Sequence, residues 1–398
     1  MAFFLVSCCH GLHQAVRGAA AAVPCLSGRH TRLAHNQPDD MTPEALAKRE
    51  ARARKRAQRQ SPEGVAAAAA AATAAADAKR AARRERDVRE AAVLRQWGVR
   101  GVDGAPMPLV DIGANLVKLK DPAALAHQLR RCQLTGVSRV LVTGTSVEAS
   151  RRALELAAAG GGVKGAHGAA GAEGARLFCT AGVHPHEAKG FGPSTLQSLR
   201  PLLRAAECVA VGESGLDYDR MFSSREAQLL CFERHAALAV ELGMPLFLHE
   251  RDRDPAKGAP LGSHADLLRV LDDAGVRPER CCVHCFTGSA AELRDYAQRG
   301  YYVGLTGFVA MRERGAALRA ALREGALPLA QLMLETDSPF MRPDREHLPE
   351  VKSLRHGRCE PCVLPAVCNA VAECYGVHPS AVARVTTANA VGFFGLED

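Results

Sequence analysis

The sequence predicts an α/β protein built as a (β/α)₈ barrel of the TIM type, preceded by a basic extension that is either helical or disordered. Three observations support this prediction. From Met107 onward, short apolar runs typical of buried strands alternate with stretches whose apolar residues recur every three or four positions. Eight such runs fit into residues 107–398, which is the length of one barrel. Several of the runs end in metal-ligating residue types, and the carboxyl ends of barrel strands converge on one face.

The expected strands are apolar runs bounded by polar or glycine-bearing segments. They are residues 109–112, 138–144, 177–183, 208–213, 245–249, 281–285, 301–305 and 331–336. Helical periodicity predicts helices at residues 121–135, 146–158, 195–206, 224–242, 263–274, 290–299 and 312–323. Segments 159–175 and 253–262 are expected to be surface loops. An open doubly wound sheet is the alternative fold, but ligand-type residues ending so many strands would not meet at one switch point.

The basic charge is confined to the front quarter of the chain. Residues 1–100 hold 18 Lys+Arg and 9 Asp+Glu, whereas the rest holds 33 and 34 and is nearly neutral. Residues 1–38 contain three arginines and no acid, which is typical of an organellar (mitochondrial or plastid) transit peptide, with a cytoplasmic location as the alternative. Residues 39–106 are rich in Ala and Arg and are expected to form a solvated or disordered extension before the barrel, residues 107–398. No apolar run reaches the ~20 residues that span a bilayer, so no membrane partner is expected.

Four metal-type side chains each end an expected strand: Glu213, His249, His284 and Asp337. Two imidazoles and a carboxylate supply fixed ligands for a divalent ion and leave a position open for water. Asp337 is expected both to bind metal and to accept a proton from the attacking water. A lone histidine at a strand end is more often a hydrogen-bonded core residue, but four polar groups at one end of a barrel are costly without an ion.

A further pair of histidines, His184 and His186, ends the third expected strand. Pro185 stiffens the turn between them, so both imidazoles can face the site, where they can donate to a scissile phosphate or bind a second metal through an unprotonated nitrogen. Hydrogen bonds that stabilise the turn are the alternative role. We therefore expect His184, His186 and Asp337 to take part in catalysis.

A series of motifs between residues 109 and 396 resembles the TatD-type deoxyribonuclease family. The motifs are DIGANL (111–116), GVHPH (182–186), GESGLDYDR (212–220), MPLFLHER (244–251), VHCFTG (283–288), GLTG (304–307), LETDSPF (334–340) and TTANAVGFFG (386–395). The resemblance implies a metal-dependent (β/α)₈ hydrolase that cuts phosphodiester bonds, with 3′→5′ exonuclease action on DNA typical of the family. It places the metal ligands on the four strand-end residues named above and the two histidines near the substrate phosphate.

Three segments depart from the family pattern. Residues 111–113 read Asp-Ile-Gly where many members have Asp/His-x-His, which weakens the case for a tightly held second metal. Residues 249–251 read His-Glu-Arg where His-Cys-Arg is common, and residues 358–361 read Arg-Cys-Glu-Pro in place of Arg-Asn-Glu-Pro. The substrate contacts that the resemblance implies are Asn115, Arg251 and Glu360.

The leading hypothesis is a monomeric metal-dependent nuclease that acts on DNA, with RNA as the alternative substrate. Mg²⁺ is the expected cofactor, as one or two ions, and Mn²⁺ and Zn²⁺ are the alternatives. A metal-dependent ester or amide hydrolase, such as an aminoacyl-tRNA deacylase, is the second hypothesis. The third is a non-catalytic nucleic-acid-binding protein that works through its basic tail. Metal-dependent release of mononucleotides would separate the first hypothesis from the other two.

Overall fold

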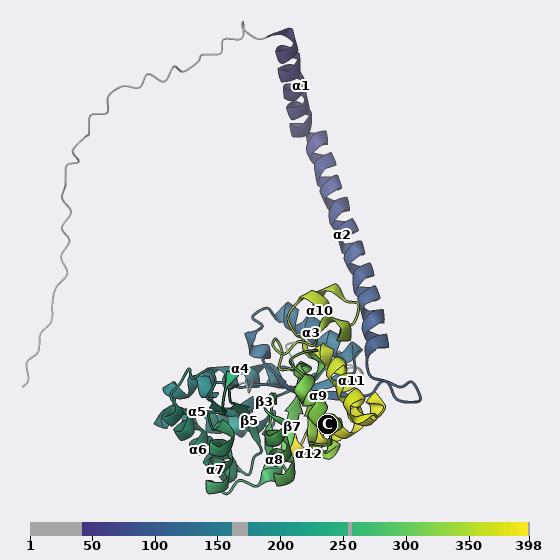
Figure 1. Ribbon diagram of the computed structural model, residues 1–398. Helices are drawn as coiled ribbons and strands as arrows, with labels where there is room; N and C mark the ends of the chain where they lie inside the picture. Colours follow the sequence, from purple (N-terminus) through teal and green to yellow (C-terminus); the bar gives the residue numbers. More distant parts are fainter. Residues whose placement is uncertain (1–41, 161–173, 254–256, 397–398) are drawn as a thin grey trace, which may run out of the picture. The chain divides into compact units, whose positions relative to one another are not determined.

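The computed structural model describes residues 42–160, 174–253 and 257–396 (Figure 1). The chain divides into two compact units, Met1–Lys79 and Arg80–Asp398. The expected transit peptide and most of the glycine-rich segment 159–175 lie outside the described residues. None of the described helices is both long and apolar enough to cross a membrane.

The second unit is built around a parallel barrel, as predicted. Its strands pair in the order in which they occur in the sequence. A parallel bridge between Ala114 and Ser338 brings the first strand beside the end of the last one, so the sheet closes on itself. The strands are β1 Leu109–Ala114, β2 Val137–Val142, β3 Arg176–Ala181, β4 Cys208–Asp217, β5 Leu246–Arg251, β6 Cys281–Val283, β7 Tyr302–Leu305 and β8 Leu332–Leu334.

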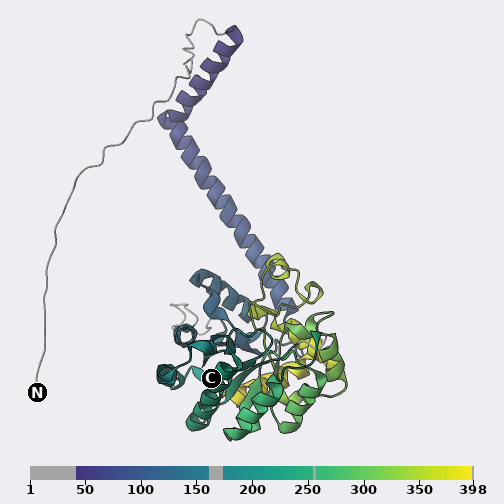
Figure 2. The same ribbon diagram turned by 60° about the vertical axis from the view of Figure 1, so that its left-hand side comes forward.

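Helices surround this sheet (Figures 1 and 2). The seven expected helices are present as α3 Pro122–Leu134, α4 Val147–Ala158, α5 Pro193–Leu203, α6 Arg225–Leu242, α7 Ser263–Asp273, α8 Ala290–Arg299 and α9 Ala316–Arg323. Local signals delimit them: Ser224 caps α6 by accepting a hydrogen bond from the N–H of Ala227, and Gly243 ends it in the left-handed conformation. Three helices after β8 were not identified from the sequence. They are α10 Lys352–His356, α11 Leu364–Tyr375 and α12 Pro379–Phe394.

A small apolar cluster fills the interior of the barrel. Val110 and Ile112 of β1 belong to it, because alternate residues of a strand point to the same side. α12 contributes Phe394, whose ring lies 6.3 Å from the ring of Phe247 on β5. The ring of Phe247 in turn lies 4.5 Å from the imidazole of His284. The apolar interior therefore continues up to the polar end of the barrel.

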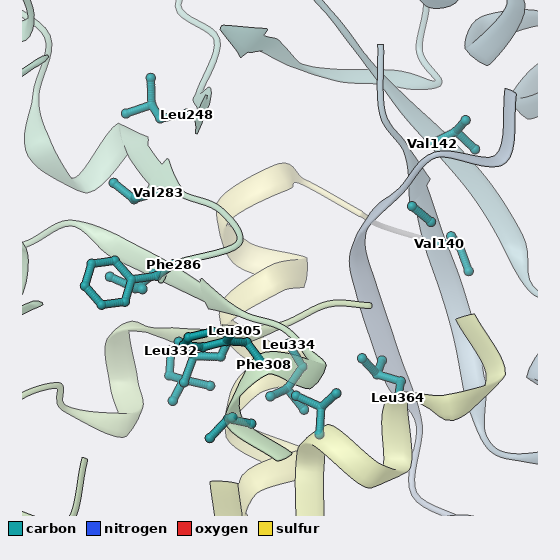
Figure 3. Packing of buried hydrophobic residues seen from close by; sticks show 14 of the residues in the cluster. Val140, Val142, Leu248, Val283, Phe286, Leu305, Phe308, Leu332, Leu334 and Leu364 are labelled. Atoms are coloured by element: carbon teal, nitrogen blue, oxygen red, sulfur yellow. The ribbon is translucent and has the colours of Figure 1, made fainter. Parts of the chain in front are cut away.

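A larger apolar cluster packs the strands against the helices. Figure 3 shows members of this layer, including Val140 and Val142 of β2 and Leu332 and Leu334 of β8, spaced two residues apart on one side of each strand. All four are at most 1% exposed. Burying a side chain of this size contributes about 1.5–3 kcal/mol, so this layer supplies much of the stability of the barrel.

The described part of the extension is helical, with α1 at Pro43–Gln60 and α2 at Pro62–Trp97. α1 buries no residue, as expected for a solvated helix. The end of α2 differs from that expectation, because Leu94 is fully buried and belongs to the outer cluster together with Val99. The end of α2 therefore packs with the barrel inside the compact unit Arg80–Asp398.

A buried arginine joins the end of α2 to the segment before α11. The side chain of Arg131 on α3 is 6% exposed. Its Nε donates to Oε1 of Glu90 at 2.6 Å, and its Nη1 donates to both carboxylate oxygens of Glu360 at 2.8 and 2.9 Å. Its Nη2 donates to the hydroxyl of Ser353 at 2.7 Å. The two carboxylates compensate the buried guanidinium, which presents a planar fork of donors to them.

We expect Arg131→Met to lower the free energy of unfolding by about 3–5 kcal/mol, because it leaves the carboxylates of Glu90 and Glu360 without their partner. Urea denaturation followed by circular dichroism measures this loss. Arg130→Met is the matched control, since Arg130 is exposed on the same helix. Equal stability of the two variants would show that the network contributes little.

A buried histidine supports the loop that follows β3. Nε2 of His235 on α6 accepts a hydrogen bond from the N–H of Val183 at 3.1 Å, and its Nδ1 lies 2.7 Å from the carbonyl oxygen of Cys231. Nδ1 must therefore carry the proton, and the ring is neutral. Burial lowers the pKa of His235 to about 4, although the carbonyl of Cys231 opposes this shift.

We expect His235 to make the barrel acid-sensitive. Its pKa is about 6.5 in an unfolded chain. Its contribution to stability is therefore complete above that pH and is lost as the pH falls to about 4, by about 3 kcal/mol in total. Unfolding free energies of the wild type and of His235→Gln should converge as the pH is lowered from 7.5 to 4.5. A constant difference over this range would contradict the assignment.

Candidate functional site

Polar side chains gather at the carboxyl end of the barrel, as the sequence predicts. Because all strands are parallel, residues that end different strands meet there although they are far apart in the sequence. The group consists of His184 and His186 after β3, Glu213 and Asp217 on β4, His249 on β5, His284 after β6 and Asp337 after β8.

The carboxylate of Glu213 is the centre of this group. Its Oε1 lies 3.1 Å from Nε2 of His184, 3.0 Å from Nδ1 of His249 and 2.8 Å from Nε2 of His284. Glu213 is only 4% exposed. Burial alone would raise its pKa, but the imidazoles of His184 and His284 hold the pKa well below its usual range. Glu213 is therefore an anion that three histidines stabilise.

The histidines around Glu213 differ in their charge. Burial lowers the pKa of His184 to about 4, so this imidazole is neutral at pH 7. Burial also acts to lower the pKa of His249, but the neighbouring carboxylates of Asp217 and Glu213 raise it to about 8. The ligand-type atoms of His184, Glu213 and His249 all lie within 4.8 Å of one another. His184 thus belongs to a group of metal-type donors, and the sequence allowed either a metal or a phosphate contact at this position.

Asp217 is a member of the site that was not identified from the sequence. Its Oδ2 lies 2.7 Å from Nε2 of His186 and 3.5 Å from Nε2 of His249. Its Oδ1 accepts a hydrogen bond from the N–H of Arg220 at 2.8 Å. Although burial opposes it, the hydrogen bond with His186 and the nearby imidazole of His249 keep the pKa of Asp217 far below its usual range. The site therefore contains a second anion on β4.

Asp337 stands beside this cluster and is held by its neighbours. The amide Nδ2 of Asn115 donates to its Oδ1 at 2.9 Å, and the thiol of Cys285 lies 3.6 Å from its Oδ2. Its backbone N–H donates to the carbonyl of Gly113 at 2.8 Å. Burial raises the pKa of Asp337 to about 7, although the charge of His284 opposes the shift. A carboxyl group with this pKa is suited to proton transfer near neutral pH.

A fully buried carboxylate, Glu335, lies below the site and was also missed. Its Oε2 is 3.3 Å from Nδ1 of His284, and it accepts a hydrogen bond from the N–H of Cys285, so it orients His284 toward Glu213. A Cβ at Gly304 would come within 2.6 Å of Glu335, and a Cβ at Gly113 would also clash with it. Gly113, which stands where many family members have a histidine, thus makes room for the carboxylate of Glu335.

The three expected substrate contacts have different surroundings. Asn115 binds Asp337, as described above. Nη2 of Arg251 forms an ion pair with Asp219 at 3.0 Å, and its side chain is 34% exposed, so it remains accessible to a ligand. Glu360 instead gives both of its oxygens to Arg131. Glu360 therefore has a structural role as the partner of a buried arginine. A contact between Glu360 and the substrate stays a prediction that the geometry does not support.

Lys118 is a cation near the site that was not identified from the sequence. It ends the short helix η2 Leu116–Lys118 after β1. Partial desolvation lowers the pKa of its ammonium group, whereas the carboxylates of Asp337 and Glu213 act to raise it. Lys118 therefore lies within electrostatic reach of both carboxylates.

Comparisons with known proteins agree with this architecture. A family model described as TatD related DNase matches residues 110–395. The 3′-5′ ssDNA/RNA exonuclease TatD of Cronobacter sakazakii is 36% identical over 286 residues, which make up 72% of this chain and 97% of that protein. The protein of the same name from Citrobacter rodentium is 34% identical over 288 residues, 72% of this chain and 98% of its own.

Solved structures show the same fold. The crystal structure of a hydrolase TatD family protein from Entamoeba histolytica superposes with a TM-score of 0.60 at 21% identity, covering 72% of this chain and 98% of that one. The TatD homologue YJJV from Escherichia coli K12 gives a TM-score of 0.59 at 24% identity, covering 73% and 98%. The resemblance seen in the motifs is thus confirmed, and the chain belongs to the TatD-related DNase family of hydrolases.

Proposed function

We propose that this protein is a metal-dependent 3′→5′ exonuclease that hydrolyses single-stranded DNA, with RNA as a second substrate. The observation that carries the proposal is the convergence of His184, His249 and His284 on the buried carboxylate of Glu213 at the carboxyl end of a barrel. The printed name of the two curated relatives supports the polarity and the single-stranded substrate.

The donor set fits a divalent ion. Nε2 of His249 is buried and has no hydrogen-bond partner among the described residues, although it lies only 3.5 Å from Asp217. Imidazole nitrogens and carboxylate oxygens together suit Mg²⁺, Mn²⁺ or Zn²⁺. His184, Glu213 and His249 would hold the ion, with His284 and Asp337 alongside. A bound divalent ion would polarise the phosphoryl oxygens and make a water molecule more acidic.

The side chains of the chain itself would handle the proton and the phosphate. Asp337 accepts the proton of the attacking water, and Asn115 fixes the orientation of its carboxylate. The imidazole of His186, 29% exposed, is positioned by Asp217 through Nε2, and as an imidazolium it would donate from Nδ1 to a phosphate oxygen. Lys118 and the partly exposed Arg251 would offer positive charge to the phosphates that flank the scissile one.

We expect His284→Ala to lower kcat/KM on single-stranded DNA about 10²-fold or more, since His284 holds the Glu213 carboxylate in place and the interactions lost with it contribute several kcal/mol to the transition state. The unfolding midpoint in urea should show that the fold is retained. His264→Ala is the matched control, because His264 pairs with Asp295 and lies outside the cluster around Glu213. A His284→Ala protein with near-normal activity would falsify the assignment.

The direct test is the hydrolysis of end-labelled single-stranded DNA by the full-length protein with Mg²⁺ and, separately, with a chelator. With a 5′ label, 3′→5′ digestion should yield a ladder of shortening products, and the chelator should abolish it. Release of mononucleotides from the 5′ end would overturn the polarity. Hydrolysis of an aminoacyl ester with no cleavage of DNA would favour the ester hydrolase.

A further inference from the structure

Two exposed phenylalanines stand out on the surface. Phe222 is 55% exposed and Phe340 is 49% exposed, and no other Phe, Tyr or Trp in the described part of the chain is exposed. A single exposed apolar side chain is ordinary on a protein surface. These two share a location, because both lie in loops that leave the carboxyl end of the barrel.

Each phenylalanine contacts a residue of the candidate site. The ring of Phe222 meets the imidazole of His186 edge to face, with ring centroids 4.7 Å apart. Phe340 follows Asp337 by three residues, and its backbone N–H donates to the carbonyl of Asp337 at 2.9 Å. The ring of Phe222 therefore lines the centre, and the backbone of Phe340 is anchored to the segment that carries Asp337.

The two phenylalanines flank the centre from opposite sides. Phe222 follows β4, and Phe340 follows β8. The eight strands pair in sequence order around the barrel, so β4 and β8 are four positions apart and face each other across the axis. A chain that crosses the centre between them would pass one aromatic ring before the catalytic groups and the other ring after them.

The backbone has the same unusual conformation beside both rings. Met221 precedes Phe222 with a φ of 49°, and Met341 follows Phe340 with a φ of 44°. Only four non-glycine residues in the described part of the chain have a positive φ, and the other two are Cys285 and Asp337 of the centre. Such residues are uncommon and concentrate at functional sites, so the two loops share this feature with the catalytic segments.

Positive charge accompanies the aromatic rings. Nζ of Lys118 lies 4.1 Å from the centroid of the Phe340 ring. On the side of Phe222, the partly exposed guanidinium of Arg251 pairs with Asp219, three residues before Phe222. An aromatic face with a neighbouring cation matches a nucleotide, whose base stacks while its phosphate pairs with the cation.

We propose that Phe222 and Phe340 are base-stacking platforms that hold one unstacked base on each side of the phosphate to be cleaved. This inference rests on the proposed nuclease function and adds to it the groups that recognise the substrate. Every base has a π face, so the platforms accept any sequence. They exclude a duplex, because paired bases are already stacked on their neighbours. The two loops thereby select single strands.

Binding without cleavage tests the platforms directly. In chelator, the full-length protein is titrated into single-stranded DNA that carries 2-aminopurine near its 3′ end, because stacking quenches the fluorescence of this base. The wild type should quench it. Phe222→Ala and Phe340→Ala should each weaken binding on the order of tenfold and reduce the quench. Phe222→Tyr and Phe340→Tyr should restore both. Leu230→Ala is the control, since Leu230 is 48% exposed on α6, away from the centre.

Activity supplies an independent comparison. With Mg²⁺, the ratio of kcat/KM for a normal strand to that for a strand of abasic residues should fall about tenfold in each Phe→Ala variant. In the double variant, Phe222→Ala with Phe340→Ala, the quench and the kcat/KM ratio should both fall. If neither changes, the stacking proposal is overturned while the nuclease function stands. If the wild-type protein cleaves no strand but quenches 2-aminopurine, and the variants do not quench it, the nuclease proposal fails and the stacking sites remain.

Discussion

The polar end of this barrel depends on the compensation of buried negative charge. Glu213 is removed from water, and an unpaired carboxylate in that position would cost several kcal/mol. His184, His249 and His284 supply the compensation through contacts of 2.8–3.1 Å with one oxygen of Glu213. The same contacts hold the donor atoms close together, so one set of interactions both stabilises the site and organises it for binding an ion.

Residues below the site hold these side chains in position. Glu335 orients His284 from below, and it has room to do so because Gly113 and Gly304 present no side chain there. Phe247 packs against the lower face of His284 and belongs to the apolar interior. Hydrogen bonds and packing from several strands therefore fix the imidazole, and with it the carboxylate of Glu213 that would hold an ion.

The barrel and much of its site could be predicted from the sequence, because buried strands and amphipathic helices have distinct local periods. Asp217 was missed because the expected strand ended at residue 213, whereas β4 continues and places Glu213 and Asp217 on the same side. The role of Glu335 depends on glycines of other strands, which no local pattern reveals. The partner of Glu360 is Arg131, 229 residues away, so only the folded chain shows their ion pair.

The central claim is that the carboxylate of Glu213 organises a centre for a divalent ion. The most direct measurement is Mn²⁺ binding, followed by electron paramagnetic resonance as the loss of the free-ion signal, in the wild type and in Glu213→Gln. The variant keeps the shape of the side chain and removes its charge. The account predicts saturable binding of at least one Mn²⁺ per wild-type chain and a loss of that binding in the variant. Equal binding by the two proteins would contradict it.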